Sequence, residues 1–137
     1  MYRRIVEHKV RTTWQRVNAG DLEAAVGLAA DDVRFEFAGS TPISAQLASR
    51  DAFRAWFAET ARRLPGLQFE LLDVAVRGWP WRTRVATRLR VRSDQLVGGP
   101  YENTMTQWIT LRWGRMTDDW VMEDTAMLER VLALQPV

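Results

Sequence analysis

The stretch from Tyr101 to Thr125, YENTMTQWITLRWGRMTDDWVMEDT, constrains the fold more than any other part of this chain. Between residues 101 and 113 two sets of side chains interleave with a period of two, which is typical of an extended strand. Both sets contain large apolar residues, with Met105 and Ile109 in one and Trp108 in the other. We therefore expect one face of this strand to pack densely and the other to line a partly polar cavity or an interface.

The end of the same stretch predicts a second strand of a hairpin. We expect residues 114–119 to form the turn and Trp120 to Met122 to resume the extended run. The run then ends in two neighbouring carboxylates, Glu123 and Asp124. Because successive side chains of a strand point to opposite faces, only one of the two can enter a pocket.

Periodicity upstream predicts an α+β domain. We expect helices over residues 2–18, 22–29 and 51–64, a strand over 33–37, a minor strand within 42–48, and long strands over 68–77 and 82–93. A short amphipathic helix follows the last strand, with apolar positions between 127 and 134. Helices segregated from a run of antiparallel strands predict a curved sheet wrapped around N-terminal helices. We expect residues 1–137 to form a single cone-shaped domain with an internal cavity.

Composition excludes several classes of protein. The 137 residues are 47% hydrophobic and 26% charged, which fits one globular domain and excludes wholesale disorder. No apolar run is long enough to cross a bilayer, and the charged N-terminal segment does not resemble a signal peptide, so we expect a cytoplasmic protein without a membrane partner. With no cysteine and one histidine, we expect no disulfide, no metal site and no cofactor.

The segment VNAGDLEAAVGLAADDVRFEF, with the later ITLRW and WVMED, resembles proteins of the nuclear transport factor 2-like superfamily, and most closely their SnoaL-like, polyketide cyclase-like branch. The resemblance implies a cystatin-like cone with a deep apolar pocket, and usually a homodimer. It also implies a small hydrophobic or aromatic metabolite as ligand. Cofactor-free acid/base catalysis of the cyclase, isomerase, dehydratase or hydrolase type would follow from it.

Comparing this chain residue by residue with the catalytic groups of such proteins narrows the possible reactions. The catalytic groups of ketosteroid isomerase would fall near Thr13, Phe37 and Thr106, which excludes that mechanism. Polyketide cyclases use a carboxylate near the end of the last strand, where this chain has Glu123, Asp124 or, if the register slips by one, Thr125. We favour Asp124, which shares a face with Trp120 and Met122, and an arginine on a middle strand, Arg88, would be its partner. The candidate pocket residues are Trp14, Phe35, Phe37, Phe53, Trp56, Phe57, Thr106 and Trp108.

Simpler interpretations stand beside these. The carboxylate could be an exposed strand-end acid or part of a salt bridge, and the aromatic residues could be plain core. The chain could then be a non-catalytic ligand-binding or dimerisation module. The arginines between Arg82 and Arg92 suit a solvated sheet face or a dimer interface through the convex side of the sheet. Nucleic-acid binding by this strand, with Trp79 and Trp81 stacking on bases, is disfavoured because the net charge is only +2.

Overall fold

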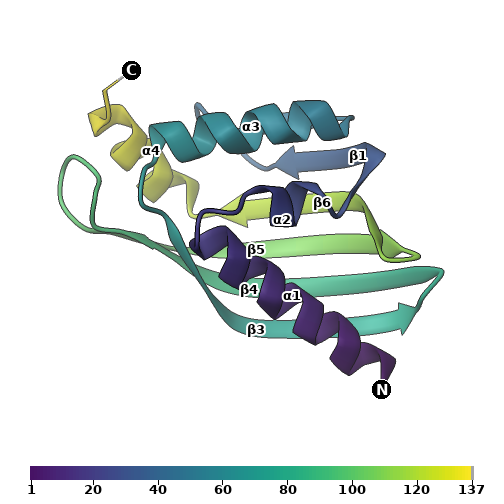
Figure 1. The fold of residues 1–137 in the computed structure, drawn as a ribbon. Coiled ribbons are helices and arrows are strands. Elements are labelled where there is room, and N and C mark those ends of the chain that lie inside the picture. The colour runs from purple at the N-terminus through teal and green to yellow at the C-terminus, as the bar shows by residue number, and fades with distance from the viewer. Residues whose placement is uncertain (137) are drawn as a thin grey trace.

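The computed structural model describes residues 1–136, and its elements follow the α+β order expected from the sequence. They are α1 (Tyr2–Asn18), α2 (Glu23–Val26), β1 (Ala29–Phe37), β2 (Ala45–Leu47), α3 (Arg50–Arg63), β3 (Gln68–Trp79), β4 (Arg82–Ser93), β5 (Tyr101–Arg112), β6 (Arg115–Glu123) and α4 (Thr125–Leu134). Figure 1 shows α1 lying across β3 and β4, and α3 lying above β1.

The six strands form one curved sheet in the order β2-β1-β6-β5-β4-β3. Neighbouring strands are antiparallel except β1 and β6, which run parallel, with Phe35 opposite Asp119 and Phe37 opposite Val121. The parallel pair is possible because a long part of the chain separates the two strands. It brings the first strand beside the last and so joins β1 and β2 to the four long strands in one open sheet.

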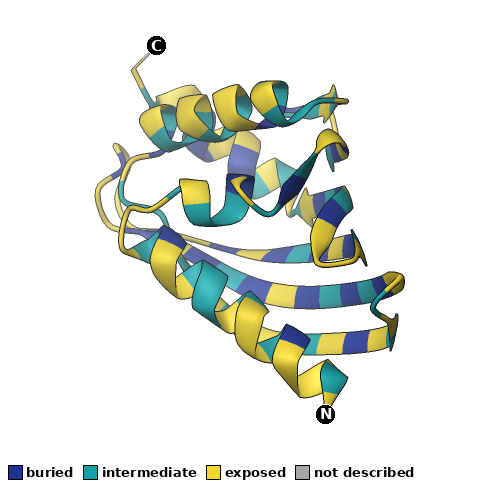
Figure 2. Cartoon of the chain, turned by 45° about the vertical axis from the view of Figure 1, so that its right-hand side comes forward, coloured by how far each residue is buried: buried dark blue, intermediate teal, exposed yellow. Residues whose placement is uncertain are grey.

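Alternation along the strands separates a concave, buried face from a convex, exposed one. In β4 the side chains of Thr83, Val85, Thr87, Leu89 and Val91 are buried, while those between them are exposed or half-buried. Figure 2 shows this banding along the long strands. The helices cover the concave face, so the hydrophobic core and any internal cavity lie between them and the sheet.

Two sequence-based boundaries were wrong. The turn between β5 and β6 consists of Trp113 and Gly114 alone, both at positive φ (51° and 79°), and β6 begins at Arg115. Two residues at positive φ form the tight turn that suits the twist of a β-hairpin. The second helix is also shorter than expected, because β1 already starts at Ala29, which pairs with Met116 of β6.

Among residues 1–136, no helix is long and apolar enough to cross a membrane.

Asn18 fastens the end of α1 to the edge strand β3. Its Oδ1 accepts a hydrogen bond of 2.8 Å from the Phe69 backbone N–H, and its Nδ2 donates one of 2.8 Å to the Phe69 carbonyl oxygen. Phe69 in turn packs against Trp14 of the same helix, with ring centroids 4.7 Å apart. The side chain therefore fixes how α1 closes over the sheet.

We expect Asn18→Ala to lower the free energy of unfolding by about 1–3 kcal/mol, because both backbone groups of Phe69 lose their partner. Urea denaturation would measure the loss. The matched control is Gln15→Ala on the exposed side of α1, which should change stability by no more than about 0.5 kcal/mol. Equal stability of the two variants would contradict this role of Asn18.

Candidate functional site

A β-bulge in β6 decides which acidic side chains enter the cone. Thr110 of β5 pairs with Asp118, but the next residue, Leu111, pairs with Met116, so Thr117 has no partner of its own. Met116 is buried and Asp119 is buried too, although simple alternation from Met116 would turn Asp118 inward. An extra residue in one strand reverses the facing of every side chain beyond it. As a result Asp119, Val121 and Glu123 face inward.

Asp119 is a carboxylic acid in an almost fully enclosed position, with 4% of its surface exposed. Its Oδ1 accepts a hydrogen bond of 3.0 Å from Gln107 Nε2, and Gln107 Oε1 accepts one of 3.1 Å from the Thr87 hydroxyl. The Thr87 hydroxyl thus orients the amide so that its N–H group points at the acid. For Oδ2 the structure shows no hydrogen-bond partner within residues 1–136.

Burial raises the pKa of the Asp119 carboxyl from 3.8 to about 7, although the hydrogen bond from Gln107 lowers it in part. The cause is desolvation, because a charged carboxylate loses more than a neutral acid when water is removed. Near neutral pH this group can therefore either donate or accept a proton.

A second acid, Glu123, faces the same interior at the end of β6. Its Oε1 accepts a hydrogen bond of 3.3 Å from the Tyr101 hydroxyl, which accepts one of 2.7 Å from Asn103 Nδ2. Burial raises the pKa of Glu123 to about 7, and that of Tyr101 well above its ordinary value. Asp119 and Glu123 lie four residues apart, which is about 13 Å along a strand at roughly 3.3 Å per residue.

Asp124, which we expected to point into the cavity, does not do so. It is the N-cap of α4, and its Oδ1 accepts hydrogen bonds from the backbone N–H groups of Ala126 (3.1 Å) and Met127 (3.2 Å). An aspartate at this position satisfies N–H groups that have no partner inside the helix. The face shared with Trp120 and Met122 is the convex one.

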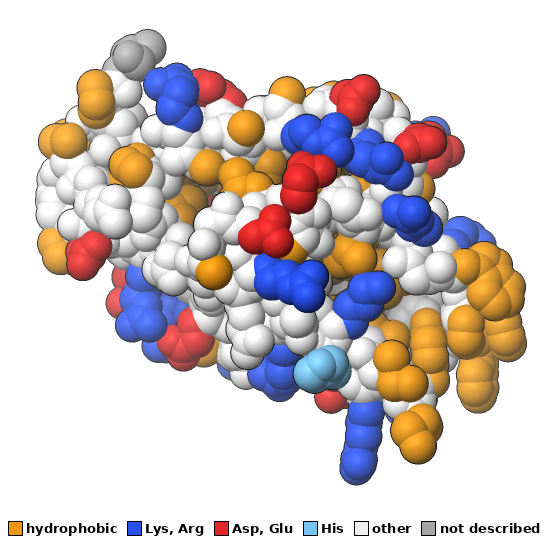
Figure 3. All heavy atoms as spheres, viewed as in Figure 1, with side chains coloured by type: hydrophobic (Ala, Val, Ile, Leu, Met, Phe, Trp, Pro, Cys, Tyr) orange, Lys and Arg blue, Asp and Glu red, His pale blue; other side chains and the backbone are white. Residues whose placement is uncertain are grey.

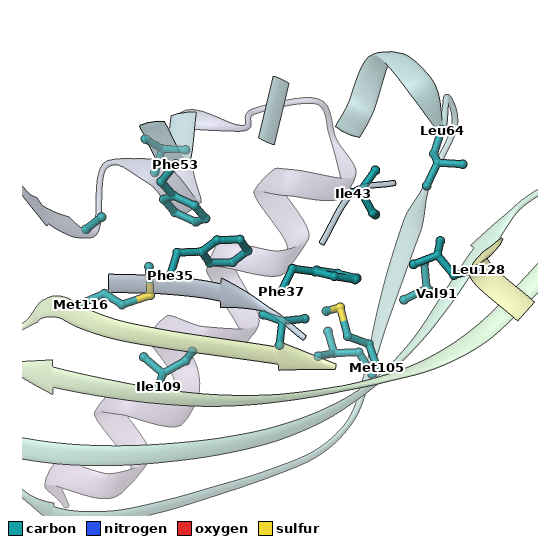
Figure 4. Close-up of a cluster of buried hydrophobic side chains, with 14 of the residues drawn as sticks. Phe35, Phe37, Ile43, Phe53, Leu64, Val91, Met105, Ile109, Met116 and Leu128 are labelled. Atoms are coloured by element: carbon teal, nitrogen blue, oxygen red, sulfur yellow. The ribbon is translucent and has the colours of Figure 1, made fainter. Parts of the chain in front are cut away.

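The inward acids border a cavity of about 350 Å³ between α1, α3 and the sheet. Its wall includes six of the predicted pocket residues, Trp14, Phe35, Phe37, Phe53, Trp56 and Phe57. Phe35 stacks obliquely on Phe53 and Trp56, with ring centroids 4.8 and 4.6 Å away. Figure 4 shows Phe35 below Phe53 and Phe37 below Ile43, with Met105 and Ile109 on the strand beneath. The cavity is therefore aromatic, with Asp119, Gln107, Tyr101 and Glu123 as its polar groups on the sheet side.

The other predicted site residues lie on the convex face, outside the cavity. Arg88 is exposed, Thr106 is half-buried, and Trp108 has 44% of its surface exposed beneath the guanidinium of Arg84, 5.7 Å from the ring. All three occupy even-numbered positions of β4 or β5, and the odd-numbered ones turn inward. The expectation that Thr106 and Trp108 line the pocket was wrong because both faces of β5 carry large side chains, and Arg88 lies on the exposed face of β4.

The arginines of β4 lie on the solvated outer face of the sheet, and some of them pair with acidic side chains on the neighbouring strands. Arg90 Nε lies 3.0 Å from Glu102 Oε1 on β5, and Arg92 Nη2 lies 3.1 Å from Glu70 Oε2 on β3. Cross-strand pairs of opposite charge stabilise a sheet modestly. These contacts account for part of the positive charge of the strand.

Three residues of the site were missed by sequence reasoning: Asp119, Gln107 and Tyr101. Asp119 falls within the turn predicted over residues 114–119, and glycine and aspartate are both typical of turns. Gln107 and Tyr101 share the parity of Met105 and Ile109, so the alternation of β5 contained the signal once its inner face was known. Within residues 1–136 no group of three or more His, Cys, Asp or Glu side chains is arranged to hold a metal ion.

Residues 10–119 match the sequence model of the SnoaL-like domain. The chain belongs to the SnoaL-like domain family. The matched segment contains Gln107 and ends at Asp119, whereas Glu123 lies beyond it. No curated protein matches this chain in sequence.

Solved structures share the fold at low sequence identity. IdmH, a putative polyketide cyclase from Streptomyces antibioticus, is 21% identical with a TM-score of 0.70, over 93% of this chain and 97% of that one. An NTF2-like protein of unknown function from Burkholderia pseudomallei is 18% identical with a TM-score of 0.74, over 92% and 95%. TerC, co-crystallised with polyporic acid, is 15% identical with a TM-score of 0.73, over 92% and 96%. The fold is the nuclear transport factor 2-like fold.

The raised pKa of Asp119 predicts a pH dependence of stability. Below about pH 4 both folded and unfolded chains hold the proton. Between about pH 4 and 7 only the folded chain retains it, so the free energy of unfolding contributed by this group falls as pH rises and is lost above pH 7. Asp119→Asn should remove this decline, so the stability of the variant relative to wild type should rise from pH 4 to pH 7.

Urea denaturation at several pH values would measure this difference. Glu123 contributes a decline over a similar range, so the variant should retain that part. Asp118→Asn, at the exposed neighbouring position, is the control and should keep the wild-type profile. Parallel profiles for Asp119→Asn and wild type would contradict the enclosed, neutral acid.

Proposed function

We propose that this protein binds a small hydrophobic or aromatic metabolite in the aromatic cavity and catalyses proton transfer on it without a cofactor, with Asp119 as acid and base. The observation that carries the proposal is the Asp119 carboxyl group, which has a pKa near neutrality and is held by Gln107 in the wall of a mainly apolar cavity rich in aromatic side chains. Such a perturbed acid in a concave apolar pocket is the usual mark of acid/base catalysis.

The hydrogen-bond geometry assigns different roles to the two carboxyl oxygens. Gln107 holds Oδ1, which leaves Oδ2 for the ligand. As a carboxylate, Asp119 would remove a proton from a carbon next to a carbonyl group, and as the acid so formed it would return the proton to another atom of the same ligand. Isomerisation and ring closure of a polyketide-like compound both need this sequence. The surrounding rings exclude water and orient a flat substrate.

Glu123 and Tyr101 serve a different part of the ligand. At about 13 Å from Asp119 along the strand, Glu123 is too far away to act on the same atom. Its hydrogen bond with the Tyr101 hydroxyl gives a polar group at the far end of the cavity, suited to a hydroxyl or carbonyl group of the ligand. We propose that this pair orients the bound molecule.

The similar structures support this class of function. IdmH is a putative polyketide cyclase and TerC was crystallised with polyporic acid, so this fold accommodates small organic ligands. A non-catalytic binding module would use the same cavity, and proton transfer distinguishes the two. Nucleic-acid binding has less support, because Arg90 and Arg92 already pair with acids.

Hydrogen exchange on a ligand tests the catalytic role. In D₂O, a weakly acidic aromatic ketone such as 2-tetralone, bound by the protein, should exchange the C–H protons next to its carbonyl group faster than in buffer, which proton NMR detects. Asp119→Asn should lower the catalysed rate at least about 100-fold, as expected for loss of a general base, while the Kd stays within about threefold. The rate should follow an apparent pKa near 7.

Two variants serve as controls for this experiment. Glu123→Gln should change the Kd more than the rate. Asp124→Ala should lower stability by about 1 kcal/mol through loss of the helix cap and leave exchange intact. Wild-type rates in Asp119→Asn would overturn the assignment, and tight binding without any catalysed exchange would favour the non-catalytic module.

We also propose a cytoplasmic homodimer that forms through the convex face. Trp108 and Trp120 are cross-strand partners there, and Met122 beside them has 44% of its surface exposed. A contiguous apolar patch on the outer side of a sheet commonly marks an interface between subunits.

In sedimentation velocity at micromolar concentration, the wild type should be dimeric and Met122→Arg should be monomeric, because the charge would be buried without a partner. Val97→Arg, at an exposed apolar residue in the β4–β5 loop, is the control and should stay dimeric. A monomeric wild type would contradict the proposal.

A further inference from the structure

A second cavity of about 320 Å³ lies on the other side of Asp119. It is enclosed by α1 from Tyr2 to Trp14, by residues around α2, and by the hairpin ends of the sheet. Its lining is mostly aliphatic, with Val6 and Val10 from α1, Ile109 and Leu111 from β5, and Met116 from β6. Apart from the shared wall, its charged side chain is that of Lys9. Neither the fold nor the proposed function explains this space.

The two cavities are separated by a thin wall. They share five lining residues: Trp14, Phe53, Phe57, Gln107 and Asp119. Asp119 is the ionisable member of this set, so its carboxyl group borders both spaces. The rest of the wall consists of the Gln107 amide and three aromatic side chains, of which Trp14 and Phe57 are half-buried rather than locked in the core.

The second cavity has its own opening at the hairpin end of the molecule. Ile5 and Trp113 line it and are also largely exposed, as expected for residues at a mouth. Figure 3 shows hydrophobic side chains gathered at the end where the N-terminus of α1 lies. Figure 1 places the β5–β6 turn at the same end.

The volumes indicate how the two spaces work together. Ligand pockets of proteins span about 300–1,000 Å³, so either cavity alone lies at the lower limit. Two apolar spaces that meet at one carboxyl group fit a longer molecule whose ends lie in different cavities. In that arrangement the middle of the molecule lies beside Asp119 Oδ2.

We propose that the second cavity binds one end of an elongated, mainly apolar ligand whose other end occupies the first cavity, so that the reacting atom is internal to the molecule. This inference rests on the proposed function, since it assumes an apolar ligand in the first cavity. It adds the substrate class: a long molecule that passes through the wall at Trp14, rather than a compact one.

Straight-chain alcohols of six to fourteen carbons are suitable probes, with Kd measured by isothermal titration calorimetry. For wild type the affinity should rise about fourfold per methylene group, the equivalent of roughly 0.8 kcal/mol, up to a length that neither cavity holds alone. Two matched variants each block one cavity. Thr13→Trp fills the second cavity and Thr60→Trp fills the first. Each replaces a half-buried threonine that lines only that cavity.

A ligand that occupies both cavities should lose affinity when either cavity is filled. Each variant should weaken binding of the fourteen-carbon alcohol at least tenfold and change that of hexanol by no more than about threefold, because one cavity stays open. Ala25→Phe repeats the block of the second cavity should Thr13→Trp not fold. If only one of the two blocks, or neither, weakens the long alcohol, the ligand does not span the cavities and this inference fails while apolar binding stands. If no alcohol binds to wild type, the proposed function fails together with it.

Discussion

The unpaired Thr117 in the β5–β6 ladder determines the chemistry of the interior. Because Leu111 pairs with Met116 and Thr110 with Asp118, β6 changes its inward face between the hairpin and its middle. The hairpin end contributes Met116 to the core, and the remainder contributes Asp119 and Glu123 to the cavities. Bulges commonly redirect a side chain toward a functional site. The Gln107 contact, the raised pKa and the junction of the two cavities all follow from this change.

The sequence correctly predicted the order of the elements and the aromatic residues that the helices contribute to the cavity wall. A helix that packs on a sheet has one apolar face, so the period of Phe53, Trp56 and Phe57 indicates both the helix and its inner side. The same holds for Phe35 and Phe37, which alternate with charged residues. Where hydrophobicity differs between two faces, the pattern identifies the buried one.

The sheet side of the site could not be predicted in this way. In β5 and β6 each face holds large apolar groups, Met105 and Ile109 inside, Trp108 and Trp120 outside. Periodicity then cannot tell which face of each strand points inward. The choice between Asp124 and Glu123 depends on how many residues the hairpin contains. A bulge leaves no compositional signal in a run such as Arg115 to Asp119. The polar residues of the interior could therefore be identified only once the pairing of β5 with β6 was known.

The bulge also makes the identity of the interior acid depend on strand pairing as well as on residue type. With the same residues and no bulge, simple alternation from Met116 would turn Asp118 and Asp124 inward and Asp119 and Glu123 outward. A family in which some members lack the bulge can exchange its acidic group without substituting any carboxylate. Aligned columns of β6 in two relatives can thus point to opposite sides of the sheet, and a shared aspartate need not mean a shared reaction.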